Sequence, residues 1–196
     1  MIIIKTYILF DLEALGENKY NDFMEIIEIA AHKVIIIDNI KTSNEYMRRK
    51  ISPQFLIIDS FHTYISPVFH TNISKKMSKL LNIDMEALKN GLPYDEALYK
   101  FIDWAGENVV FLSWSNSDKI MIEENNRYLL SNIPPYMEFK DLQKAYDRNY
   151  HKSKRTGLNT AVEEIGEMFD GKQHNAVNDS INMLPILKNI RKSPLR

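Results

Sequence analysis

The sequence predicts an α/β fold, in which a mixed β-sheet is flanked by α-helices. Three apolar segments with strand character follow one another near the N-terminus without a helix between them, which predicts an antiparallel meander. From Ile73 onwards, helical periodicity alternates with two further short strands. A chain of 196 residues suits one domain around a single core, so we expect residues 1–196 to form a single domain.

The meander is predicted from three segments rich in β-branched and aromatic residues, namely Thr6–Glu13, Glu25–Ile37 and Gln54–Ile65. The first segment ends in acids, and the other two end at turn-type residues. The polar stretch Ile40–Pro53 is expected to form an extended loop, or a loop with one helical turn.

The rest of the chain is predicted to be mainly helical, because its apolar residues recur at helical spacing. Asn108–Trp114 is apolar enough for a strand buried on both faces. Pro185 falls inside the final helix, which we expect to be kinked or divided there. The other elements are expected to be a strand at Tyr136–Leu142 and helices at Ile73–Leu81, Asp84–Leu88, Tyr94–Ala105, Asp118–Leu130, Leu142–Tyr150, Leu158–Phe169 and Ala176–Arg191.

Composition excludes several classes of protein. Hydrophobic residues make up 44% of the chain and charged residues 26%, a globular balance, and every apolar run is far shorter than the roughly 20 residues that span a membrane. The absence of cysteine excludes disulfides and thiolate metal sites, which suits the cytoplasm. The net charge is −1, so nucleic acid would be attracted only locally, and basic runs occur at Arg48–Lys50, at Lys152–Arg155 and in the tail Lys188–Arg196.

Asp11 and Glu13 end the first predicted strand. Residues two apart on a strand point to the same face, so both carboxylates should meet at one place. Crowded carboxylates raise each other's pKa unless a cation neutralises them, and hard divalent ions prefer oxygen ligands. Taken alone, the pair is more simply explained as two surface acids at a strand end.

Two further motifs contain acids at the start of predicted helices. Asp118 follows a buried strand and a short polar loop, where it would either cap a helix or face a site at the strand ends. Asp179 comes five residues after His174, a separation that places them about 140° apart on one helix. The two can converge only if His174 precedes the helix, in the loop opened by Gly171; otherwise both merely solvate the helix start.

Together these residues are suited to two-metal hydrolysis of phosphodiesters. Two divalent ions clamp the attacking and leaving oxygens, and several carboxylates balance their charge. A histidine at the rim can accept the proton of the attacking water. The candidate catalytic set is Asp11, Glu13, Asp118, His174 and Asp179.

The same motifs, in this order, resemble the DEDD superfamily of 3′→5′ exonucleases, in its histidine-bearing (DEDDh, DnaQ-like) branch. They are Phe10–Glu13 followed by Glu25–Ala30, Trp114–Asp118, and His174-x4-Asp179 with Asn182 after it. Phe61–Pro67 and Gly157–Val162 add further similarity, especially to the subgroup that trims RNA 3′ ends and includes KapD-type proteins.

The resemblance implies an RNase H-like fold with about five strands and two bound divalent cations, Mg²⁺ or Mn²⁺. It implies that Asp11, Glu13 and Asp179 hold the first ion, and that Asp11 and Asp118 hold the second. Two positions depart from the family: Leu15 replaces a threonine that seats the terminal 3′-hydroxyl, and Ser115–Ser117 replaces a glycine and an aromatic residue.

Substrate contacts are expected around this site. The segment after Asp11 supplies Leu12, Ala14 and Leu15, and the basic flank supplies Lys154 and Arg155, beside side chains on which bases can stack. We expect a monomer or homodimer that releases 5′-mononucleotides from single-stranded RNA. The alternatives are the same chemistry on DNA, in proofreading or repair, and an inactive nucleic-acid-binding module on the same fold.

Overall fold

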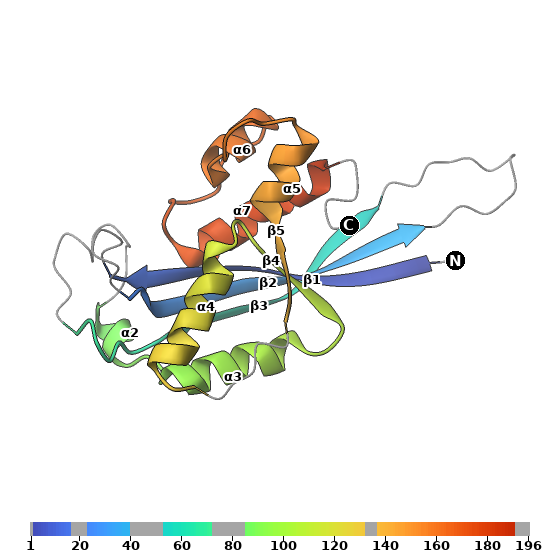
Figure 1. Cartoon of the computed structure of the whole chain (residues 1–196). Coiled ribbons are helices and arrows are strands. Elements are labelled where there is room, and N and C mark those ends of the chain that lie inside the picture. The colour runs from blue at the N-terminus through green and yellow to red at the C-terminus, as the bar shows by residue number, and fades with distance from the viewer. Residues whose placement is uncertain (1, 17–22, 40–52, 72–84, 132–136, 191–196) are drawn as a thin grey trace, which may run out of the picture.

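The computed structural model describes residues 2–16, 23–39, 53–71, 85–131 and 137–190 (Figure 1). The strands are β1 (Ile2–Leu15), β2 (Glu25–Asn39), β3 (Gln54–Tyr64), β4 (Val109–Ser113) and β5 (Glu138–Asp141). The helices are α2 (Met85–Lys89), α3 (Tyr94–Ala105), α4 (Ser117–Tyr128), α5 (Leu142–Asn149), α6 (Leu158–Glu164) and α7 (Ala176–Asn189).

The strands form one five-stranded mixed sheet in the order β3-β2-β1-β4-β5. β1 pairs antiparallel with β2 and β2 antiparallel with β3, whereas β1 pairs parallel with β4 and β4 parallel with β5. The predicted meander followed by parallel strands is therefore confirmed. β1 occupies the centre of the sheet, so residues at its C-terminal end can be approached from elements on either side.

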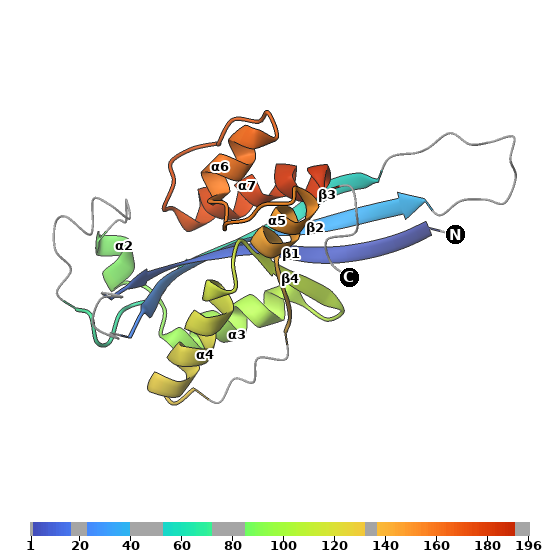
Figure 2. The same ribbon diagram turned by 45° about the horizontal axis from the view of Figure 1, so that its top comes forward.

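Helices cover both faces of the sheet, with α5, α6 and α7 on one face and α3 and α4 on the other (Figure 2). The alternation of β1 explains its apolar run, because Tyr7 and Leu9 pack toward α5–α7 while Ile8 and Phe10 pack toward α3 and α4. Asp11 continues the alternation of Tyr7 and Leu9, which places its side chain on the face covered by α7.

Several element boundaries differ from the predicted ones. β1 and β2 extend to Ile2 and Asn39, because isoleucines at their far ends continue the antiparallel ladder. α6 ends at Glu164, well before Phe169, and α7 runs through Pro185 as one helix, so its division into two helices is wrong. Among the described residues, no helix is long and apolar enough to cross a membrane.

Some predicted features lie outside the described residues. These are the helix Ile73–Leu81, the helix start at Asp84, nearly all of the loop Ile40–Pro53 with its basic run, and the end of the basic tail from residue 191.

Candidate active site

Asp11 and Glu13 lie near the C-terminal end of β1, on one face of the strand. Asp11 is half-buried and Glu13 is only 8% exposed. The pairing of β1 with β2 shifts by one residue directly after Glu13, as in a β-bulge. Such irregularities bend a strand and increase its twist, and they are frequent beside active sites.

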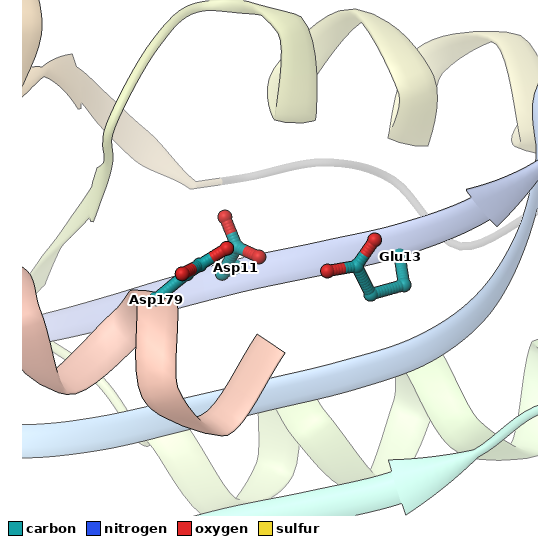
Figure 3. Close-up of side chains that lie close together, drawn as sticks. All are labelled: Asp11, Glu13 and Asp179. Atoms are coloured by element: carbon teal, nitrogen blue, oxygen red, sulfur yellow. The ribbon is translucent and has the colours of Figure 1, made fainter. Parts of the chain in front are cut away.

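Asp179 reaches the same place from α7 (Figure 3). His174 lies in the loop before this helix and Asp179 in its first turn, as the spacing required. Two left-handed residues shape the loop, Gly171 at φ +80° and His174 at φ +59°. The backbone N–H of His174 donates a hydrogen bond of 3.1 Å to Asp179 Oδ2, so the loop and the helix start are joined.

The three carboxylates form a close cluster, with one oxygen from each of Asp11, Glu13 and Asp179 lying within 4.8 Å of the others. Burial and the neighbouring charges of Asp118 and Glu13 raise the pKa of Asp11 well above its usual range. Burial, together with the charges of Asp179 and Glu28, raises the pKa of Glu13 to about 8. Burial and mutual repulsion therefore make it unfavourable for all three carboxylates to be ionised at once unless a cation binds them.

Asp118 lies beside this cluster, in the first turn of α4 directly after β4 and its loop. It is 5% exposed. The N-cap residue is Asn116, so the alternative in which Asp118 caps the helix is wrong. Burial raises the pKa of the Asp118 carboxyl to about 7, although hydrogen bonds from its own backbone, Ser113 and Leu12 oppose the shift.

The cluster fits a divalent cation. Asp179 Oδ1 is buried and, among the described residues, has no hydrogen-bond partner. All ligands on offer are carboxylate oxygens, which hard ions such as Mg²⁺ and Mn²⁺ prefer to nitrogen or sulfur. A bound cation would also relieve the repulsion that raises the pKa values of Asp11 and Glu13.

An open groove of about 480 Å³ adjoins the cluster. Asp11 and Asp179 line it together with the exposed His174. Its other walls come from the loop after β4, from α5 and from the region around α6, and include Trp114, Gln143, Arg155, Leu158 and Phe169. The groove therefore joins an acidic floor to one basic and several apolar side chains.

The structure separates the predicted substrate contacts into two groups. Arg155 lines the groove, whereas Lys154 is exposed outside its lining. Leu12 and Leu15 are buried in the core, and Ala14 is half-buried. At these leucines only the backbone is available to a substrate.

One buried acid beside the site was not among the predicted site residues. Glu28 on β2 pairs with Glu13 and is 1% exposed, and its Oε1 atom lies 2.8 Å from Nε2 of His62. Both residues belong to segments that carry the family resemblance, Glu25–Ala30 and Phe61–Pro67. Only the strand register places them on the same face as Asp11 and Glu13.

Comparisons with known proteins place the chain among exonucleases. The chain is 23% identical over 133 residues to the probable 3′-5′ exonuclease KapD of Bacillus subtilis, covering 67% of this chain and 65% of that protein. It is 27% identical over 183 residues to a PolC-type DNA polymerase III of Clostridium perfringens, covering 93% of this chain and 11% of the polymerase. The chain thus spans less than two thirds of these relatives.

A solved structure with the same fold is the nuclease domain of 3′hExo, a DEDDh family member, bound to rAMP. It superposes with a TM-score of 0.71 at 21% identity, covering 94% of this chain and 90% of that domain. The exonuclease family model RNase_T matches residues 8–187. The match contains all five predicted catalytic residues and confirms the resemblance to the DEDD exonucleases. The chain therefore belongs to the exonuclease family RNase_T.

Proposed function

We propose that the protein is a metal-dependent 3′→5′ exonuclease, which hydrolyses phosphodiester bonds at single-stranded 3′ ends and releases 5′-mononucleotides. The observation that carries this proposal is the convergence of Asp11, Glu13 and Asp179 within 4.8 Å, beside a groove that Asp11 and Asp179 line. Three buried or half-buried acids at one point have little use in a fold unless a cation binds them.

Asp11, Glu13 and Asp179 would hold a first divalent cation, and Asp11 together with Asp118 a second. When bound, two such ions, Mg²⁺ or Mn²⁺, stabilise the attacking and leaving oxygens of a phosphodiester. His174 supplies the general base: it is exposed at the groove, and its ring can accept the proton of the attacking water. The hydrogen bond from its backbone to Asp179 holds it beside the acids.

The groove would bind the strand by charge and stacking. Arg155 would contact a phosphate, while Trp114, Leu158 and Phe169 offer faces for bases. Lys154 would attract the phosphates of the strand electrostatically from outside the groove. The backbone of Leu12 to Leu15 would seat the terminal nucleotide, because both leucine side chains are buried and only their backbone is available.

RNA is the favoured substrate. The match to the 3′hExo nuclease domain, which binds rAMP, covers nearly all of both chains. DNA is the second candidate, because a DNA polymerase of the PolC type contains a segment matching 93% of this chain.

A single experiment tests the proposal. A 5′-labelled single-stranded RNA and its DNA twin are incubated with Mn²⁺, Mg²⁺ or EDTA. We expect a ladder that shortens from the 3′ end, is stronger on RNA, and disappears with EDTA and in Asp11→Asn. Asp103→Asn, at an exposed aspartate of α3 on the opposite face, serves as the matched control and should cleave normally.

The other outcomes are equally clear. Faster shortening of the DNA would favour the proofreading or repair alternative. Binding of both strands without cleavage under any metal would identify an inactive binding module. Undiminished cleavage by Asp11→Asn would show that these acids are not the active site.

A further inference from the structure

The active-site face of the sheet carries a line of polar groups that runs beyond the catalytic acids. Glu28 of β2 lies opposite Glu13, and Ala30 of β2 lies between Asp11 and His62. Directly paired residues of antiparallel strands project to the same face. Glu28 and His62 therefore lie on the same face as Asp11 and Glu13.

The Glu28 carboxylate is only half satisfied. One oxygen lies 2.8 Å from His62 Nε2, but the other, Oε2, is buried without a hydrogen-bond partner among the described residues. The side chain of Glu28 is 1% exposed, so water compensates little of its charge. Glu28 is the direct strand partner of Glu13, and its charge contributes to the raised pKa of both Glu13 and Asp179.

A second histidine–glutamate pair, between Glu25 of β2 and His70 in the segment after β3, has both carboxylate oxygens hydrogen-bonded. Both oxygens of the buried Glu25 accept hydrogen bonds, at 2.6–3.1 Å, from the backbone N–H groups of Val68, Phe69 and His70. The ring of His70 lies 3.0 Å from the same carboxylate. Glu25 thus anchors a loop, whereas one oxygen of Glu28 has no protein group to bind.

We propose that Glu28 is a further acidic member of the cation site formed by Asp11, Glu13 and Asp179, and that His62 positions it. A buried carboxylate oxygen without a partner destabilises a fold, and a cation beside it removes that cost. Groups that orient or support metal ligands change metal affinity by about 10–100-fold when removed. The inference rests on the proposed function, because it assumes that the acids bind a cation.

The test measures metal binding rather than cleavage. Mn²⁺ is titrated calorimetrically into chelator-stripped wild type, Glu28→Gln, His62→Gln and the matched control His70→Gln. Glutamine keeps the shape of Glu28 and an acceptor for His62, and removes only the charge. We expect Glu28→Gln to bind Mn²⁺ about 10–100-fold more weakly, His62→Gln to lose a smaller factor, and His70→Gln to match the wild type.

Thermal unfolding separates a role at the cation site from a structural one. In EDTA, Glu28→Gln should melt at or above the wild-type temperature, because it removes a buried charge beside other acids. Addition of Mn²⁺ should raise the melting temperature of the variant less than that of the wild type. The inference is overturned if Glu28→Gln binds Mn²⁺ within twofold of the wild type, melts at a lower temperature in EDTA, or fails to fold. If Asp11→Asn still loses affinity, the proposed function survives that failure; a wild type that binds no Mn²⁺ overturns both.

Discussion

Replacing Glu13 with glutamine is expected to stabilise the metal-free protein, and to do so more strongly at pH 8 than at pH 5. The pKa of Glu13 is about 8 in the fold, against 4.5 for an ordinary glutamate. Between these pH values the unfolded chain has released the proton and the folded chain retains it, so the free energy of unfolding falls as the pH rises. Each pH unit in this interval is worth about 1.36 kcal/mol.

The full interval would correspond to about 4–5 kcal/mol. Because the neighbouring acids titrate together with Glu13, we expect Glu13 itself to account for a loss on the order of 3 kcal/mol between pH 5 and pH 8, seen as the difference between wild type and variant. Glutamine cannot ionise, so the variant should keep most of this stability.

Urea unfolding followed by circular dichroism, in EDTA at several pH values, measures the effect. Glu107→Gln, at an exposed glutamate, is the control and should follow the wild type. With Mn²⁺ at pH 8 the order should reverse, because the cation stabilises the wild type and the variant has lost a ligand. Parallel pH profiles for wild type and Glu13→Gln in EDTA would refute the reasoning.

Three further changes address the base, the groove and the loop before α7. His174→Ala should lower turnover about 10²–10⁴-fold in single-turnover assays while calorimetry shows nearly unchanged Mn²⁺ affinity; lost metal binding would contradict its role as the base. Arg155→Ala should raise KM and reduce the steepness of log affinity against log salt concentration by about 0.7. The control Lys100→Ala on α3 should leave this slope unchanged. An unchanged slope in Arg155→Ala would show that Arg155 does not contact a phosphate. Gly171→Ala should cost about 1–3 kcal/mol in urea unfolding, because its φ is +80° and an added Cβ would meet the Asn178 amide at 2.5 Å; wild-type stability would show that the loop adapts.

Much of the candidate site could be predicted because its signals are local. The two-residue period of a strand brings Asp11 and Glu13 to one face. The five-residue separation of His174 and Asp179 requires a loop–helix junction, which is what the structure contains. Asp118 was placed by the buried strand before it, although its hydrogen bonds could not be foreseen.

Element boundaries were harder to predict, because they depend on partners distant in the chain. β1 extends to Ile2 because the far end of β2 pairs with it. α6 ends at Glu164 although its apolar pattern continues, because Gly166 adopts a left-handed conformation at φ +81° that terminates the helix.

The sequence by itself determined the type of sheet, an antiparallel meander followed by parallel strands, and the identity of the five catalytic candidates. Only the tertiary structure decided that Glu28 and His62 lie beside them, that Arg155 rather than Lys154 lines the groove, and that Leu12 and Leu15 offer only backbone. The physical reason is that register, a strand irregularity and side-chain burial arise from pairing between distant segments, which short-range periodicity does not encode.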